Sequence, residues 1–482
     1  MRKFDPTDVG WRLGVSHQPR GVPLYVPWDR TAGVIGPQGS GKTLDLLTPA
    51  LLQAPGAALV TLTKPADLLL TFTARSEGDR PCVVLDPFGI ADGLPDLVWD
   101  PVAGCHDPGV AERRAKAFAA GTVKGAVAEG HGDQAARFYA AEAAKVIQAY
   151  FHAAALTGRT LDHVLRWVSN PMAATEPGEI LREHPQATEY WAGLLHAALH
   201  GDDRTAGNTA TTVHQALSLF FQPEIRRRCV PRGRAATDID DVLARGGTIY
   251  LLGREDPYAS ASPLMTALAE HVLDRALVAA HASPHGRLTP PTLACLDELP
   301  STAPLPTLRT RMANERALGL SFIWAAQTRA QLDTTFGEQE ARSVLGLTNN
   351  LVVFGGSKDV KFNQELSDLV GTVRVARTRR HGFKWGDKSW DGEDIPILSG
   401  PEIRRLKEGT ALVLSENNAP MIAKLERAIA GRHGKRLQAQ SRELAARTAT
   451  VRRHSTDTGD LLASALAASR TRGLAPADEA GA

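Results

Sequence analysis

Short apolar runs recur along the chain and predict the strands of a sheet. Residues 31–35, 57–62 and 81–86 are apolar and are ended by turn residues, and helix-like segments lie between them. Similar runs return at residues 247–253, 292–296, 320–325 and 351–354. Continuous apolar runs are typical of parallel strands that are buried on both faces. The alternation therefore predicts an α/β fold with a mostly parallel sheet.

The pattern changes to a helical one between about residue 105 and residue 235. Runs of β-branched residues nearly vanish there, and alanine-rich segments take over. In one segment the apolar side chains recur at three- and four-residue steps, as on one face of a helix: Tyr139, Ala143, Val146, Ile147, Tyr150 and Ala154. We predict a first core part at 1–103, an all-helical insertion at 104–235, a second core part at 236–430, and a basic, alanine-rich, partly helical and otherwise mobile tail at 431–482.

The segment between the first predicted strand and the first predicted helix carries the most specific motif. It has the form G-x-x-x-x-G-K-T and comprises Gly36, Pro37, Gln38, Gly39, Ser40, Gly41, Lys42 and Thr43. A glycine-rich turn can match by chance, but strand, loop and helix is the context that a P-loop requires. The backbone N–H groups would surround a phosphate, Lys42 would reach the β- and γ-phosphates, and Thr43 would bind Mg²⁺. The motif predicts binding of ATP with Mg²⁺.

A carboxylate pair follows the predicted strand at 292–296. Asp297 would hold the water shell of the metal, and Glu298 would orient or deprotonate the attacking water. Such a pair is often a solvated turn, but a preceding buried strand in a P-loop chain favours the catalytic interpretation. Along the sequence, Lys42 and Asp297 are further apart than one or two βα units require. The helical insertion between them accounts for the extra residues. Such an insertion is more typical of ring-forming translocases than of small-molecule kinases.

The next helix-like segment and strand offer a cation and an amide. Residues 304–318 carry Arg309, Arg311 and Arg316, and the strand after them ends on Gln327. An amide beside the γ-phosphate suits a sensor of hydrolysis, and an arginine projecting across a subunit boundary suits an arginine finger. A helix-capping amide and solvated arginines explain the same residues equally well, so composition alone leaves both readings open.

Composition narrows the class of protein without deciding the function. The chain has 482 residues and a net charge of +2, so two or three domains are expected and any basic surface must be local. Its four cysteines have neither disulfide-scaffold nor zinc spacing. No run of eighteen apolar residues occurs. We expect a soluble protein that is not exported.

Taken in order, these motifs resemble the TraG/TraD-type coupling-protein ATPases of conjugation and type IV secretion. The resemblance covers nearly the whole chain, and its most specific block, Leu296 to Gly371, is similar to the TraM-recognition region of that family. The matching segments are the P-loop, 83–89, 296–298, 304–306, 316–319, 327, 331–332, 366–367, 371–372, 397–403 and 409–414.

The resemblance implies a RecA-like core interrupted by an all-alpha substrate-recognition domain. It also implies a homo-hexameric motor that pumps DNA or relaxase–DNA cargo to a type IV secretion channel, with Arg316 as arginine finger and Gln327 as sensor. Two departures stand out. Phe88 stands where the family usually has Lys, and the usual initial transmembrane helices are missing. We therefore expect a cytoplasmic location at the inner face of the membrane, through a partner or an anchor outside this chain.

A basic stretch after Gly371 is the best candidate for DNA contact. It holds Arg374, Arg377, Arg379, Arg380 and Lys384, with His381 and Trp385 among them. Phosphate neutralisation with base stacking uses such residues, and a solvated hairpin accounts for them equally well. A second cluster, Arg226–Arg228 with Arg232 and Arg234, would line a channel mouth or complement helix ends.

Two other functions fit part of these observations. A nucleotide-gated docking protein would recruit cargo without processive translocation, and it would respond to a protein partner where a motor would respond to DNA. A DNA pump of the chromosome-partition type shares the motor but would not predict the TraM-recognition block.

Overall fold

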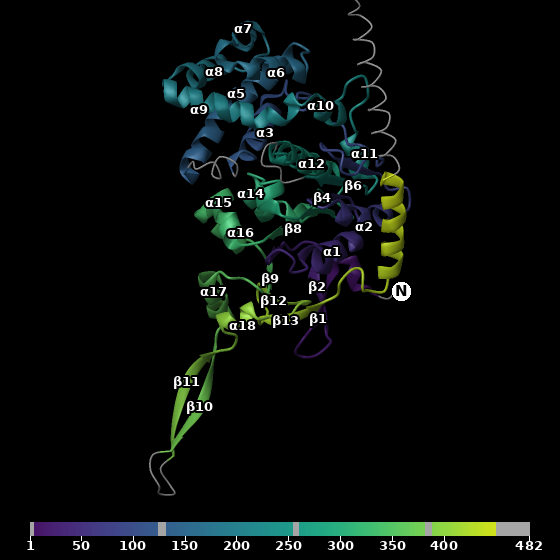
Figure 1. Ribbon diagram of the computed structural model, residues 1–482, viewed down its shortest axis with the longest axis vertical. Coiled ribbons are helices and arrows are strands. Elements are labelled where there is room, and N and C mark those ends of the chain that lie inside the picture. The colour runs from purple at the N-terminus through teal and green to yellow at the C-terminus, as the bar shows by residue number, and fades with distance from the viewer. Residues whose placement is uncertain (1–3, 124–131, 254–259, 381–387, 450–482) are drawn as a thin grey trace, which may run out of the picture.

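The protein is described by a computed structural model that covers residues 4–123, 132–253, 260–380 and 388–449 (Figure 1). In this part of the chain a helical bundle lies at one end, a large sheet with helices on both faces forms the middle, and a two-stranded hairpin projects from the other end. The predicted α/β class with a helical insertion is confirmed.

The described strands of the sheet follow the order β2-β1-β13-β12-β9-β3-β8-β7-β4-β6-β5. Neighbours from β9 to β5 are parallel, whereas β12, β13, β1 and β2 join antiparallel. The strands are β1 (Gly10–Ser16), β2 (Pro23–Pro27), β3 (Ala32–Ile35), β4 (Ala58–Leu62), β5 (Cys82–Leu85), β6 (Thr248–Leu252), β7 (Thr292–Leu296), β8 (Leu320–Ala326), β9 (Asn350–Phe354), β12 (Thr410–Ser415) and β13 (Met421–Leu425).

The burial of each strand agrees with its central or edge position in the sheet. Every residue of β3, β4, β6, β7 and β8 is buried, as expected of parallel strands covered on both faces. The edge strand β2 is largely exposed and has a proline at each end, where a missing N–H costs no ladder hydrogen bond.

Helices cover both faces of the sheet. One face carries η2 (Lys42–Leu47, a π-helical turn), α1 (Thr48–Gln53), α2 (Pro65–Arg75) and a helix over residues 434–449, and the buried apolar side chains of these helices share one core. The other face carries α12 (Ser262–Ala282), α13 (Leu299–Thr302), α14 (Leu308–Asn314), α15 (Arg329–Phe336) and α16 (Glu338–Gly346). The turn η5 (Arg316–Leu318) precedes β8, and η1 (Pro6–Asp8) precedes β1.

The helical bundle leaves and rejoins the sheet at one edge, because its chain runs from β5 to β6, which pair with each other. It packs against α12, where a Cβ at Gly121 would lie 2.4 Å from the Cα of Pro263. Its helices are α3 (Pro108–Ala120), α5 (Asp133–Leu156), α6 (Leu161–Ser169), η3 (Pro171–Ala173), α7 (Glu176–Glu183), α8 (Trp191–His200), α9 (Asp203–Leu217), η4 (Ser218–Phe221) and α10 (Pro223–Cys229), and α11 (Ile239–Ala244) leads into β6. The exact domain boundaries at 103, 235 and 430 stay predictions.

The remaining elements form the projecting hairpin and its base. The helix α17 (Val360–Val370) leads into β10 (Thr372–Arg380), which pairs antiparallel with β11 (Lys388–Pro396), and α18 (Gly400–Arg404) follows. Among the described residues, no helix is both long and apolar enough to cross a membrane.

Candidate nucleotide-binding site

The P-loop lies at the carboxyl end of β3, in the middle of the sheet. Gly39 and Gly41 have φ values of +79° and +98°, which side chains rarely adopt, so the loop needs glycine at both positions. The hydroxyl of Ser40 is buried and has no hydrogen-bond partner in the described part of the chain. A buried hydroxyl without a partner, next to loop N–H groups, fits a phosphate ligand.

Lys42 is buried inside the loop at 5% exposure. Its Nζ donates hydrogen bonds to the carbonyl oxygens of Gly36 at 2.6 Å and Pro37 at 3.2 Å. The same Nζ lies 3.6 Å from Oε1 of Glu298. The ammonium group therefore links the P-loop to the carboxylate at the end of β7.

Thr43 and Asp297 meet across the site. The Thr43 hydroxyl donates to Oδ2 of Asp297 at 2.6 Å. Burial raises the pKa of the Asp297 carboxyl, and the hydrogen bond from Thr43 and the charge of Lys42 oppose that shift. A hydroxyl and a carboxylate oxygen at the P-loop are the hard oxygen ligands that Mg²⁺ prefers, so these two residues fit that ion.

Glu298 and Gln327 complete the group. Glu298 has a φ of +50°, an uncommon value for a residue with a side chain, and such values concentrate at functional sites. Its Oε2 accepts a hydrogen bond from Nε2 of Gln327 at 3.1 Å. The contact follows from strand order, since β8 lies between β3 and β7 and brings Gln327 between the two motifs. Gln327 is not the cap of α15, because Thr328 caps that helix.

The three candidate arginines differ sharply in their surroundings. Arg311 is buried in an ion-pair network with Glu270, Asp274 and Glu315, and this network accounts for it as a structural residue. Arg309 pairs with Glu340 at the surface. Arg316 is half-buried at the opposite end of β8 from Gln327, where its Nη1 lies 3.2 Å from Oδ1 of Asn349 and 4.0 Å from Oε1 of Glu416. Arg316 does not approach the P-loop of its own chain.

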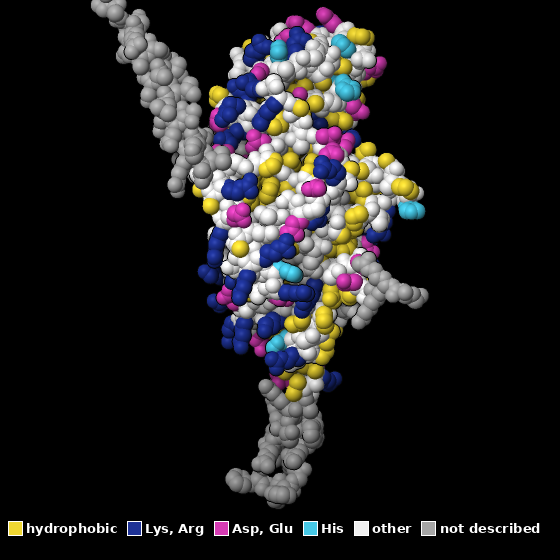
Figure 2. Space-filling view, turned by 90° about the vertical axis from the view of Figure 1, so that its right-hand side faces the viewer, with side chains coloured by type: hydrophobic (Ala, Val, Ile, Leu, Met, Phe, Trp, Pro, Cys, Tyr) yellow, Lys and Arg dark blue, Asp and Glu magenta, His cyan; other side chains and the backbone are white. Residues whose placement is uncertain are grey.

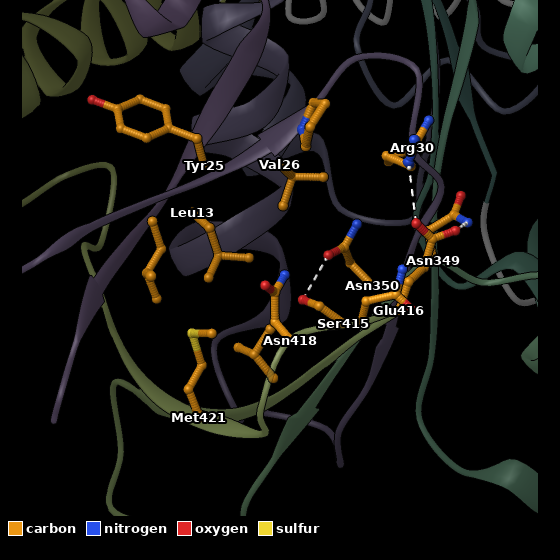
Figure 3. A pocket seen from close by; sticks show the side chains of 14 residues that line it. Leu13, Tyr25, Val26, Arg30, Asn349, Asn350, Ser415, Glu416, Asn418 and Met421 are labelled. Carbon is orange, nitrogen blue, oxygen red and sulfur yellow. Dashed lines mark hydrogen bonds and ion pairs between the residues drawn. The ribbon is translucent and has the colours of Figure 1, made fainter. Parts of the chain in front are cut away.

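A pocket of about 430 Å³ lies beside Arg316, at the amino edge of the parallel strands (Figure 3). Apolar side chains from β1, β2 and β13 form one wall, among them Leu13, Val26 and Met421. The other wall is polar: Oε2 of Glu416 forms an ion pair with Nε of Arg30 at 3.3 Å, and the Ser415 hydroxyl donates to Oδ1 of Asn350 at 2.9 Å. None of the predicted nucleotide ligands lines this pocket.

The candidate DNA-contact residues map to the projecting hairpin. Arg374 is exposed on β10. Arg377, Arg379 and Arg380 lie further along the same strand, paired by backbone to β11, and Lys384 lies outside the described residues. The second basic cluster is different, because each of its arginines contacts a carboxylate: Arg226 and Arg232 contact Asp162, Arg227 and Arg228 contact Glu224, Arg228 also contacts Asp92, and Arg234 contacts Asp96. Their charge is largely neutralised within the chain.

One pair at the site was not predicted. Asp45, in the first turn after the P-loop, is buried and holds Arg427 from the segment after β13. The one local signal for Asp45 is that it is a charged residue within an apolar helical run. Its partner, Arg427, lies too far along the chain to be predicted from that signal.

The fold and this site define the class: a P-loop NTPase with a mostly parallel sheet and a helical insertion. Residues 291–408 match the family model described as the TraM recognition site of TraD and TraG. The match includes Glu298, Arg316 and Gln327 and confirms the resemblance to TraG/TraD-type coupling proteins over this segment. A search of curated proteins gave no match.

Solved structures of a bacterial conjugative coupling protein, TrwB, share the fold. The unbound form that lacks 70 N-terminal residues superposes with a TM-score of 0.60 at 21% identity, covering 84% of this chain and 87% of that one. TrwB in complex with ADP and Mg²⁺ gives 0.59 at 21% identity, with the same coverage. TrwB with a non-hydrolysable ATP analogue gives 0.56 at 20% identity, covering 83% and 86%.

Proposed function

We propose that this chain is an ATP-hydrolysing motor of the conjugative coupling class. The main support is that the P-loop and the carboxylate pair, which are far apart in the sequence, meet in the structure. Thr43 contacts Asp297, and Lys42 and Gln327 both contact Glu298. The family match over residues 291–408 and the nucleotide complexes of TrwB support the same conclusion.

In this proposal each side chain has one task. The loop Gly36–Thr43 and Lys42 bind the phosphates, and Thr43 and Asp297 hold Mg²⁺, which neutralises the charge that develops on the phosphates. Glu298 accepts a proton from the water that attacks the γ-phosphorus, while the bond to the β-phosphate oxygen breaks and ADP leaves. Gln327, hydrogen-bonded to Glu298, reports the state of the γ-phosphate to β8.

Beside Lys42, we propose that a neighbouring subunit provides a second cation, Arg316. Of the three candidate arginines it is the one without a strong carboxylate pair in the described part of the chain. A head-to-tail ring, a homo-hexamer by family resemblance, places such a residue at the next subunit's site.

The cargo of the proposed motor is DNA or a relaxase–DNA complex. The hairpin, with Arg374, Arg377, Arg379, Arg380 and Lys384, is the proposed DNA contact, and the helical bundle is the proposed surface for secreted cargo. We also propose that the motor docks at the inner face of the membrane, to a type IV secretion channel or to an anchoring partner.

The experiment that tests the proposal is ATP hydrolysis with and without single-stranded and duplex DNA. A motor gives turnover that rises steeply with at least one form of DNA. Turnover that ignores DNA and rises only with a protein partner favours the alternative, a nucleotide-gated docking switch.

Replacing Glu298 by Gln should separate binding from hydrolysis. The amide keeps the size and the contact with Gln327 but cannot accept the proton, so turnover should fall by about 10²-fold or more. Affinity for ATP should stay near the wild-type value. Glu340→Gln, which removes a surface partner of Arg309, is the matched control. Equal turnover of the Glu298 and Glu340 variants would remove Glu298 from the catalytic group.

A further inference from the structure

A buried carboxylate lies directly beneath the P-loop. Asp45 is three residues after Lys42 in the turn η2 and is only 2% exposed. A buried carboxylate is stable only with a charged or hydrogen-bonding partner. Its backbone N–H donates to the carbonyl of Gly41 at 2.7 Å, so the residue belongs to the same tight turn as the loop.

The partner of Asp45 comes from the far end of the chain. Arg427, just after β13, donates from Nε to Oδ1 of Asp45 at 2.7 Å and from Nη2 to Oδ2 at 3.2 Å. These hydrogen bonds raise the pKa of the Arg427 guanidinium. The backbone N–H of Ala428 donates to the carbonyl of Leu44 at 2.9 Å. The C-terminal segment is therefore fastened to the P-loop helix by side chain and by backbone.

This pair contacts the loop itself and not only its helix. A Cβ built at Gly41 would lie 2.3 Å from Oδ2 of Asp45 and 3.3 Å from Nη2 of Arg427. Gly41 is the residue that turns the chain into Lys42. The Asp45–Arg427 pair therefore lies against the turn that leads into Lys42.

Beyond Arg427 the chain continues as the helix over residues 434–449, which lies along the α2 side of the sheet (Figure 1). Leu437 and Leu444 are buried, and Arg436 and Gln440 both contact Glu77, two residues after α2. Lys435, Arg436, Arg442 and Arg447 are exposed on this helix. Figure 2 shows Lys and Arg side chains spread over this face of the molecule, between acidic ones.

We propose that Arg427 is a positioning residue of the P-loop and that it couples the nucleotide to the docking of helix 434–449. The coupling rests on the proposed nucleotide site. Because Asp45 is hydrogen-bonded to Gly41 through its backbone and to Arg427 through its side chain, the loop conformation that binds phosphate and the docked position of the helix stabilise each other. Such linkage is reciprocal. Bound nucleotide stabilises the docked position of helix 434–449, and the docked helix raises the affinity for nucleotide.

The test is hydrogen exchange of residues 434–449 with and without a non-hydrolysable ATP analogue and Mg²⁺. In the wild type the analogue should slow exchange in this helix by about tenfold. In Arg427→Gln and in Asp45→Asn the helix should exchange fast with or without the analogue. The KM for ATP should rise in both variants by about the same factor, while kcat changes less. Arg427→Lys, which keeps the charge but not the bidentate geometry, should restore part of the coupling.

The control is Glu408→Gln, which removes the exposed partner of Arg427 and leaves Asp45 in place. It should keep the wild-type response. If the wild type binds the analogue but exchange in residues 434–449 does not change, the coupling is wrong and the proposed function stands. If the wild type binds no nucleotide, the proposed function fails first. A wild-type response in Arg427→Gln would also overturn the coupling.

Discussion

Replacing Lys42 by Ala reduces ATP hydrolysis to the background level, a loss of at least about 10³-fold. The ammonium group is enclosed by the P-loop and lies 3.6 Å from Glu298, so in the proposed mechanism it serves both the phosphates and that carboxylate. Its loss leaves the charge that develops during phosphoryl transfer without its main cation. The measurement is steady-state phosphate release, together with nucleotide binding, which should weaken as well.

The matched control is Lys116→Ala. Lys116 is an exposed lysine of α3 that pairs with Glu112 in the helical bundle. Its removal should leave turnover unchanged. Hydrolysis by the Lys42 variant at more than a tenth of the wild-type rate would show that the activity does not come from this P-loop.

Replacing Arg316 by Ala should leave ATP binding intact and lower turnover by about 10³- to 10⁵-fold, the range of known arginine fingers. The seven residues of β8 separate Arg316 from Gln327, a span of about 20 Å at the rise of a β-strand. Arg316 therefore cannot reach the γ-phosphate in its own chain, and the proposed effect on turnover requires a neighbouring subunit.

Arg309→Ala is the control for this variant, because Arg309 is an exposed arginine on the preceding helix α14. It should hydrolyse ATP at the wild-type rate. If the Arg316 variant does the same, Arg316 only pairs with Asn349 and Glu416, and another group must supply the cation.

Local patterns were sufficient to single out residues that the fold brings together. Strand, glycine loop and helix around Lys42 lie within a dozen residues, and a buried strand ending in Asp297-Glu298 can end only at the carboxyl edge of the sheet. Gln327 was predicted to end a strand beside the γ-phosphate, whereas the sequence did not predict its contact with Glu298. It becomes specific only with the strand order, in which β8 separates β3 from β7.

Contacts between distant segments were beyond the reach of the sequence. In the sequence, Arg311 and Arg316 are equally good candidates, because both lie in the same helix-like segment. In the structure, Arg311 is buried in a network with three carboxylates, which gives it a structural role. In the sequence, Arg226–Arg228 with Arg232 and Arg234 form a basic cluster. In the structure, acidic residues from α6, from α10 and from the segment after β5 pair with these arginines. Asp45 and Arg427 are nearly a whole chain apart, and no spacing pattern connects them.

In the proposed motor, each ATP site combines the P-loop of one subunit with Arg316 of the next. The most direct test is ATP hydrolysis by a mixture of the Lys42→Ala and Arg316→Ala proteins, each of which is inactive alone. Random assembly of equal amounts leaves about a quarter of the interfaces with both an intact P-loop and an intact Arg316. If the sites are shared between subunits, turnover should appear on mixing and approach that fraction of the wild-type rate. A mixture as inactive as its components, under conditions where wild-type rings form, contradicts it.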